Sequence, residues 1–388
     1  MMRAAQIAMR HAAHHKGRTL LLVLCVTVAA FLPLATRVLA RQFETTLRER
    51  AANTPLVAGA KGSRFDLVMA ALYYRRADIT PISMADWQSL QDANLADVIP
   101  LNVRFTARNH PIVCTPPDYF ALRRLRIATG SLPERIGDAV LGARAARELG
   151  LKPGDAIFSD QRELYDIAKA PALKMRITGV LAPSHGPDDD CVFADIKTAW
   201  LLEGVMHGHA DTSQLPASLV EGKADNNVVV SEAMVDYNEV TDANIATYHM
   251  HGDATTLPLT GAILVPRSQK DWSLIKARFN AKDRVQIVSP AEVVDELIGQ
   301  VLRLAGLMDI LALVVGAITS VLIGLVTALS VRVRAREIET LVKIGASRRT
   351  IAAIFGLEMA LVIALGVGLA LLGAWLLTQA PPDLVKLL

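Results

Sequence analysis

The chain has 388 residues, 52% of them hydrophobic and only 5% aromatic, and its formal net charge is +3. This length predicts about two or three structural units, and the near balance of charge gives no support for nucleic-acid binding. Three cysteines are too few for a disulfide framework. The basic residues gather instead at 3–18 and 332–349, and each group adjoins a long apolar segment, which is typical of a membrane protein.

The N-terminal part of the chain predicts two helical segments. Residues 1–18 are interpreted as a cytoplasmic amphipathic helix, because small and apolar side chains such as Ile7 share one side of it. Residues 19–40 predict a first transmembrane helix, and the cations before it keep the N-terminus inside. A cleaved signal peptide is the alternative, but Arg37 interrupts the apolar run before the small residues where cleavage is expected.

Residues 41–300 contain no further spanning segment and predict a mixed α/β domain outside the cytoplasm. Gly150 is the expected end of one helix, and the turn Lys152–Asp155 then leads into a strand at Ala156–Phe158. Helices are expected at Phe65–Tyr74, Met84–Ala93 and Asp138–Leu149. Further strands are expected at Asp97–Phe105, Met175–Leu181, Val228–Ser231, Ala262–Pro266 and Val285–Val288.

The chain returns to the membrane through a helix that opens at Ser289, where Glu292 has the spacing of a capping box. Residues 301–331 and 351–378 predict the second and third transmembrane helices, since about 20 apolar residues span a bilayer. Residues 332–350 between them are cytoplasmic under the positive-inside rule, and residues 379–388 then form an extracytoplasmic tail.

The cytoplasmic connector predicts a helix, a break and a second helix. Ile338, Leu341 and Val342 make an apolar edge on an otherwise charged helix. Gly345 ends that helix, and Ser347 caps the next one. Such a helix–turn–helix can dock in a groove of another protein on the cytoplasmic side. The alternative is a basic loop that only sets topology and binds anionic lipid headgroups.

The run from Arg334 to Glu358, RAREIETLVKIGASRRTIAAIFGLE, resembles the ABC transporter permeases of the MacB/FtsX/LolC type, the mechanotransmissive or type VII family. Their pattern is R-x-R-E-I-x-x-L-x-x-I-G-A-S-x-x-x-I, followed by a membrane helix with an early Glu. Residues 141–155 together with 176–181 resemble the MacB-like periplasmic core domain. The resemblance implies ATPase coupling by Arg334, Arg336, Glu337, Ile338, Leu341, Ile344, Gly345, Ala346, Ser347, Arg348 and Arg349.

The fold class that follows is an α-helical membrane protein, with three transmembrane helices and a large mixed α/β extracytoplasmic domain of the MacB type. The family usually has a fourth membrane helix, and this chain predicts three. No GxxxxGK[ST] phosphate loop occurs, so ATP and Mg²⁺ are expected in a separate ATPase and this chain is expected to be non-catalytic.

The resemblance implies a multi-pass permease of the bacterial inner membrane that couples ATP hydrolysis by that ATPase to conformational work in the periplasm. The work is export or extraction of a lipoprotein, a drug or another substrate. Expected partners are the ATPase, a second permease copy in a homodimer, a periplasmic adaptor or lipoprotein, and membrane lipids, but no nucleic acid. The alternatives are a regulator of a periplasmic partner, similar to FtsX, and a component of a zinc-handling ABC system.

Small residues recur four apart in both later membrane helices and predict close packing, with a second permease copy as the hypothesis. Alanine-rich helices often show such stripes without it. Two acids also lie in these helices, where charge is expensive. Both acids are therefore candidates for a functional role. The alternative is that each lies near an interface, where Glu358 is expected to pair with Arg348 or Arg349 and Asp309 is expected to stay hydrated. Glu358 matches the early acid of the family, which favours a clamp between the connector and this helix. The stripes are Gly316, Ser320 and Gly324, and Gly356, Ala360, Ala364 and Gly368.

The predicted outer domain holds two His-x-His pairs, His207 with His209 and His249 with His251. Residues two apart point the same way on a strand, and imidazole suits Zn²⁺ or Cu²⁺, so these pairs are candidate metal ligands. The alternative is that they are solvated loop residues. Cys114 and Cys191 form either a disulfide or two separate thiols.

Overall fold

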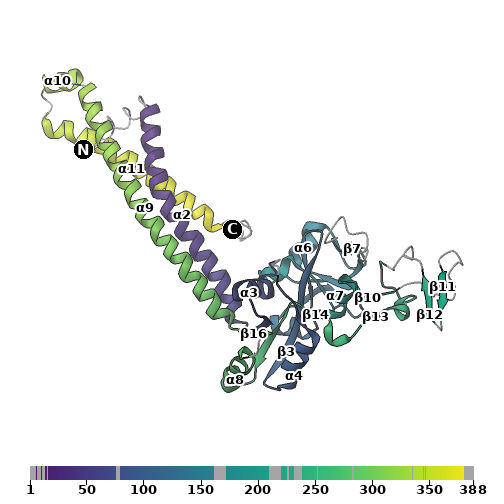
Figure 1. Ribbon diagram of the computed structural model, residues 1–388. Helices are drawn as coiled ribbons and strands as arrows, with labels where there is room; N and C mark the ends of the chain where they lie inside the picture. Colours follow the sequence, from purple (N-terminus) through teal and green to yellow (C-terminus); the bar gives the residue numbers. More distant parts are fainter. Residues whose placement is uncertain are drawn as a thin grey trace. The chain divides into compact units, whose positions relative to one another are not determined.

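The computed structural model describes residues 6, 10, 14, 16–75, 79–160, 172–208, 220–224, 227–230, 238–250, 252–281, 284–333, 335–343, 345 and 347–379, without the side chains of 220–224, 227–230, 337 and 341. The chain divides into two compact units. The helix unit comprises Met1–Glu49 and Asp295–Leu388, and the α/β unit comprises Arg50–Val294 (Figure 1).

The helix unit is formed by α2 (Lys16–Ala52), α9 (Pro290–Val333), α10 (Ala335–Lys343) and α11 (Arg348–Gln379), of which α2 and α9 also contribute their outer turns to the α/β unit. Among the described residues, three helices are long and apolar enough to cross a membrane: α2, α9 and α11. They contain the predicted segments 19–40, 301–331 and 351–378 and run beyond them. The extensions are polar residues with high helix propensity, such as Gln42, Glu44 and Arg48 in α2.

Inside the helix unit, α2 runs antiparallel to α9. Polar contacts mark this pairing along its length: Arg18 with Ser330, Arg37 with Asp309, and Arg48 with Asp295. Helix α11 packs on α2 through small residues. A Cβ built on Gly366 would lie 2.6 Å from Val26 Cγ1, and one on Gly373 would lie 2.9 Å from Phe31. Close backbone approach at small residues is how helices pack in lipid, where no water is displaced.

The α/β unit contains sixteen described strands. They are β1 (Leu56–Ala60), β2 (Ile82–Ser83), β3 (Ala96–Ala107), β4 (His110–Cys114), β5 (Ile127–Gly130), β6 (Asp138–Leu141), β7 (Ala156–Phe158), β8 (Lys174–Leu181), β9 (Val192–Ala194), β10 (Met206–His207), β11 (Val220–Ala224), β12 (Asn227–Val230), β13 (His249–Met250), β14 (Pro258–Leu259), β15 (Gly261–Pro266) and β16 (Val285–Val288).

Its described helices are α3 (Arg64–Tyr73), α4 (Met84–Asp92), α5 (Asp118–Arg123), α6 (Ala143–Leu149), α7 (Ile196–Leu202) and α8 (Gln269–Asn280), with short 3₁₀ turns η1 (Pro187–Asp190), η4 (Ile245–Thr247) and η5 (Ala254–Thr256). Serine caps begin several of them, as local sequence requires. Ser63 accepts from the amide of Asp66 at the start of α3, and Ser83 forms a capping box with Asp86 at the start of α4.

One long strand organises the main sheet, whose order in the described residues is β16-β1-β15-β3-β4-β9-β6-β8-β5, with β7 also paired to β8. The first half of β3 pairs with β15, from Gly261↔Leu101 to Pro266↔Ala96. Its second half pairs with β4, from Asn102↔Cys114 to Ala107↔His110. The strand therefore belongs to two half-sheets, and each half-sheet has a core of its own.

The two cores are separate clusters of buried apolar side chains. One includes Leu56, Val98 and Phe279 between β1, β3 and α8. The other includes Ile112 and Trp200, between β4 and α7. Full burial of a side chain of this size contributes roughly 1.5–3 kcal/mol. These clusters give the α/β unit two close-packed cores of its own.

Most predicted elements of this unit are confirmed within a residue or two, and β7 and β16 have the predicted bounds. Gly150 ends α6 with φ 67°, as predicted. The prediction of one helix over Asp138–Leu149 is wrong. Its first part is β6, because Val140 and Leu141 pair with β8 and β9 and are fully buried. Tertiary pairing overrides the local helix preference of this alanine-rich run.

The helix α9 begins at Pro290 after Ser289, as predicted. The side chain of Glu292, which was expected to complete a capping box with Ser289, instead pairs with α8. Both of its carboxylate oxygens accept from Lys276 Nζ, at 2.8 and 3.0 Å. An ion pair with α8 therefore holds the first turn of α9.

Candidate functional site

The connector between α9 and α11 has the predicted helix–turn–helix form. Helix α10 ends at Lys343, and Gly345 follows with φ 99° and its amide 2.9 Å from the carbonyl oxygen of Val342. Ser347 caps α11, because its Oγ accepts from the amide of Thr350 at 3.2 Å. Glycine is the residue that adopts this positive φ without strain.

The connector residues proposed for ATPase coupling are mostly exposed where the structure describes their burial. Arg336, Gly345, Ser347, Arg348 and Arg349 are exposed, and Ile338 is half-buried. Arg334, Ile344 and Ala346 lie outside the described residues, as do the side chains of Glu337 and Leu341.

A buried acid lies close to this connector in the sequence and joins three helices. Glu358 of α11 is 2% exposed, and its carboxylate is bound by the guanidinium of Arg18 from α2. Arg18 also donates to Ser330 Oγ, three residues before the end of α9. We call Arg18, Ser330 and Glu358 the three-helix polar cluster. The expected pairing of Glu358 with Arg348 or Arg349 is corrected, because the partner comes from α2.

Asp309 is also paired with an arginine of α2. Its Oδ2 accepts from Arg37 at 2.9 Å, and the two side chains are 39% and 63% exposed. The expectation that Asp309 is simply hydrated is therefore corrected. The same Arg37 that interrupts the apolar run of α2 in the sequence is the counter-ion of this acid.

The predicted small-residue stripes do not form the packing of the helices within the chain. Gly356, Ala360, Ala364 and Gly368 are exposed, as are Ser320 and Gly324, and Gly316 is half-buried. The face of α11 that packs inside the chain is shifted by two residues, to Glu358, Val362, Gly366, Ala370 and Ala374. The predicted stripes remain available to lipid or to another protein.

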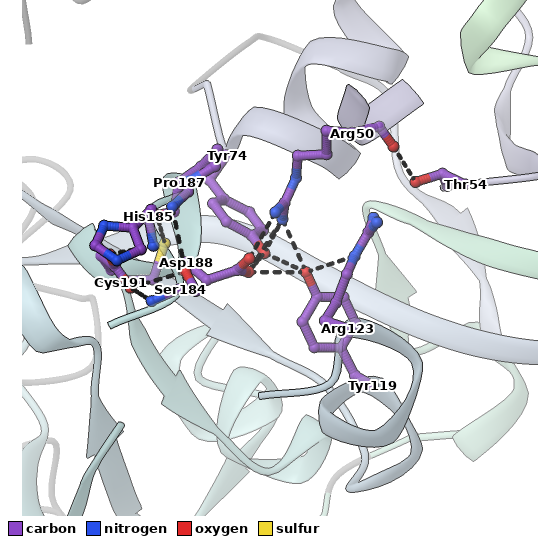
Figure 2. Close-up of polar contacts among 12 residues, drawn as sticks. Arg50, Thr54, Tyr74, Tyr119, Arg123, Ser184, His185, Pro187, Asp188 and Cys191 are labelled. Carbon is purple, nitrogen blue, oxygen red and sulfur yellow. Dashed lines mark hydrogen bonds and ion pairs between the residues drawn. The ribbon is translucent and has the colours of Figure 1, made fainter. Parts of the chain in front are cut away.

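A second buried polar site lies in the α/β unit at the last turns of α2 (Figure 2). We call Arg50, Tyr74, Tyr119, Arg123 and Asp188 the Arg50 network. The guanidinium of Arg50 donates to both oxygens of Asp188, at 2.5 and 3.0 Å, and to the hydroxyls of Tyr74 and Tyr119, at 2.8 and 3.1 Å. Arg123 donates to the Tyr119 hydroxyl at 3.3 Å. The side chains of Arg50 and Asp188 are only 10% and 4% exposed.

Burial and charge shift the pKa values of this network in the directions its geometry implies. Burial raises the pKa of the Tyr74 and Tyr119 hydroxyls, so both stay neutral and act as hydrogen-bond donors. Burial also disfavours the charged form of Asp188, but the charge and hydrogen bonds of Arg50 outweigh this and lower its pKa. The pair is therefore ionised at neutral pH.

The Arg50 network was not predicted from the sequence. Its contacts join Arg50 to residues 24, 69 and 138 positions away, and no local pattern reports such pairs. The run of three acids Asp188–Asp190 also stabilises the chain next to this network. Asp189 binds the backbone amides of Ser184 and His185, and Asp190 pairs with Arg144 at 3.2 Å. Asp189 and Asp190 therefore stabilise the local chain around η1 and its contact with α6.

The structure pairs the histidines across strands and leaves the two cysteines apart. His207 lies opposite His249 across two strands, while His209 and His251 lie outside the described residues. Cys114 and Cys191 are thiols, so the disulfide alternative is excluded. Their strands are parallel with Ile112 opposite Val192, which offsets the two cysteines by roughly 10 Å along the strands. A disulfide needs Cα atoms within about 7 Å.

Three long apolar helices, a helical connector and a folded α/β unit are the architecture of a membrane protein with a large domain outside the bilayer. The model of the MacB-like periplasmic core domain matches residues 19–243, more than half of the chain. The model of the FtsX-like permease C-terminal domain matches residues 310–382. The chain belongs to the MacB/FtsX family of ABC transporter permeases.

Solved structures give two further likenesses. The periplasmic region of MacB from Actinobacillus actinomycetemcomitans is 10% identical with a TM-score of 0.37, covering 65% of this chain and 97% of that chain. The extracellular domain of the noncanonic ABC-type transporter YknZ from Gram-positive bacteria is 10% identical with a TM-score of 0.33, covering 60% and 98%. Both scores are below 0.5, so the family assignment rests on the family models. No curated protein matches the chain.

Proposed function

We propose that this chain is the permease subunit of a mechanotransmissive ABC transporter in the bacterial inner membrane. A separate ABC ATPase binds ATP and Mg²⁺, and its closure drives conformational work by the α/β unit in the periplasm. The observation that carries the proposal is the three-helix polar cluster, which joins to α2 the two helices that flank the connector.

The ATPase docks on residues 335–349. Helix α10 lies between the end of α9 at Val333 and the start of α11 at Arg348, so a push on α10 moves both. Arg18 binds Ser330 of α9 and Glu358 of α11, and α2 therefore moves with them. Separating a buried ion pair costs about 3–5 kcal/mol when one partner is left behind, which favours motion of the three helices as a body.

The force reaches the α/β unit through covalent continuity. Helix α2 is unbroken from Lys16 to Ala52, and its Arg50 is held by Asp188. Helix α9 is unbroken from Pro290 to Val333, and its Glu292 is held by Lys276. In this mechanism no solute has to pass between the membrane helices.

The substrate class is a periplasmic molecule, such as a lipoprotein or a drug handed to an adaptor. A second permease copy completes the transporter as a homodimer, and the exposed stripe Gly356, Ala360, Ala364 and Gly368 suits its packing. Lipid covers the remaining apolar surface of α9 and α11.

The test of coupling is Gly345→Trp. Tryptophan at φ 99° strains the turn between α10 and α11. We expect membrane insertion to persist and co-purification of the ATPase to be lost. The matched control is Gly299→Trp in α9, at a glycine that also has no atom within 4 Å of an added Cβ. Unchanged recovery of the ATPase with Gly345→Trp contradicts the docking surface.

A second variant separates docking from transmission. Glu358→Gln keeps the size of the side chain and removes the charge that holds Arg18. We expect the ATPase to remain bound. Spin labels placed on the α/β unit of each permease copy should no longer change their distance when ATP is added. Retained ATP-driven changes in this variant contradict the role of the three-helix polar cluster. Activation of a cell-wall hydrolase without substrate movement favours the FtsX-like regulator instead.

A further inference from the structure

The two histidines that the sequence places 42 positions apart meet on a small ribbon of the α/β unit. β10 and β13 are antiparallel, with His207 opposite His249 and Met206 opposite Met250. Both methionines pack against a core cluster. Because side chains alternate between the two faces of a strand, the histidines stand together on the other face of the ribbon.

The separation of the two imidazoles fits a shared metal ion. Their ring centroids are 4.9 Å apart and the ring planes are inclined by 70°. Two imidazoles that each bind one tetrahedral zinc ion at about 2.0 Å place their ring centres roughly 5 Å apart. The observed separation of the two ring centroids therefore matches that of two imidazoles that share one ion.

A hydrogen bond to the backbone fixes the tautomer of His249. Its Nδ1 lies 2.9 Å from the carbonyl oxygen of Thr247. A carbonyl oxygen only accepts, so Nδ1 carries the proton and Nε2 carries the lone pair that a metal uses. Metal-binding histidines in proteins are oriented in this way by a second hydrogen bond.

We propose that His207 and His249 form a binding site for a divalent transition metal of the zinc type. His249 binds through Nε2 and His207 through an imidazole nitrogen. Among the described residues no group of three or more His, Cys, Asp and Glu side chains surrounds an ion.

The alternative role of the pair is purely structural. Directly opposed aromatic side chains stabilise an antiparallel ribbon without any metal. The experiment therefore measures metal binding and stability separately. It does not depend on transport, so its failure leaves the proposed permease function untouched.

The test uses untagged full-length protein in nanodiscs after removal of metal with a chelator. Titration with Co²⁺ is followed by its visible absorption, and Zn²⁺ is used as the competitor. We expect one equivalent per chain in the wild type and none in His207→Gln/His249→Gln. The matched control is His185→Gln, at an exposed histidine outside the ribbon, which keeps the wild-type stoichiometry.

A second measurement keeps the result independent of folding. Zn²⁺ is expected to raise the melting temperature of the wild type and of His185→Gln, because it binds the folded state, but not that of the double variant. Full metal stoichiometry in the double variant overturns the proposal. So does loss of binding in His209→Gln/His251→Gln when His207→Gln/His249→Gln retains it, because the ion then lies elsewhere.

Discussion

The two units of this protein differ in how far their large apolar side chains are exposed. In the described part of the α/β unit, the large apolar side chains that stay exposed are Phe158 and Leu274. Helix α9 of the helix unit exposes Leu313, Val321 and Leu325 by 75%, 68% and 67%. The hydrophobic effect stabilises the α/β unit, because folding removes its apolar side chains from water. It contributes little to the packing of helices in lipid, because lipid tails are as apolar as the side chains.

The units also differ in how they hold buried charge. Asp188 is enclosed by Arg50 and by the hydroxyls of Tyr74 and Tyr119. Glu358 relies on Arg18, which it shares with Ser330. In the α/β unit the Arg50–Asp188 ion pair adds to the stability that the two apolar cores provide. In the helix unit such pairs and small-residue contacts hold the helices against one another.

The largest effect is expected when the Arg50 network is broken. Asp188→Ala leaves the guanidinium of Arg50 buried without its counter-ion, and we expect the free energy of unfolding to fall by about 3–5 kcal/mol. Chemical unfolding of the full chain in detergent, followed by tyrosine fluorescence, measures this. Asp97→Ala is the control, because its pair with Arg267 is exposed and contributes less than about 1 kcal/mol. Equal losses in the two variants contradict the comparison.

An intermediate effect is expected for a small-residue contact of the helix unit. In Gly366→Ala the new methyl group meets Val26 at 2.6 Å, and overpacking of this kind costs about 1–3 kcal/mol. Gly368→Ala is the matched control two residues away, where an added Cβ meets nothing within 4 Å. Thermal unfolding in detergent compares the two. A larger loss for Gly368→Ala excludes the packing of α11 on α2 described above.

Gly368 also tests the predicted packing of α11 against a second copy of the chain. Gly368→Leu adds bulk to the exposed stripe of α11 and leaves the contacts within the chain unchanged. If the proposed second copy packs on this stripe, its association is expected to weaken, as measured by crosslinking or single-molecule photobleaching in nanodiscs. Undiminished dimerisation assigns this stripe to lipid.

The smallest effect is a pH dependence of the α/β unit. Because Arg50 lowers the pKa of Asp188 below its ordinary value of 3.8, the folded state binds this proton less readily than the unfolded chain does. The stabilisation by the carboxylate is therefore complete above that ordinary value and is lost as pH falls through the folded pKa. The stability difference between the wild type and Asp188→Asn is expected to be constant near pH 7 and to shrink in acid. A difference that grows below pH 4 contradicts this sign.

The local elements of the fold could be predicted because their causes lie close together in the chain. Ser347 and Gly345 mark the break in the connector, and Gly150 marks the end of α6. The Asp138–Leu149 prediction failed where tertiary contacts compete with local preference, since β6 is a strand only because β8 and β9 flank it.

The candidate sites were predicted only in part, because a charged residue in a sequence does not reveal its partner. Asp309 and Glu358 were recognised as costly acids in apolar helices, but their counter-ions lie 272 and 340 positions away on α2. The His-x-His pattern pointed to the ribbon, whereas the pairing across strands between His207 and His249 came from the structure.

The sequence by itself determined the three apolar helices, the basic connector and the family, because hydropathy, charge order and a contiguous motif are properties of the chain. The tertiary structure decided which face of α11 packs inward, which arginine holds each buried acid, and which histidines meet. A helix with small residues on more than one face has several ways to pack, and only the shapes and charges of its actual neighbours select one.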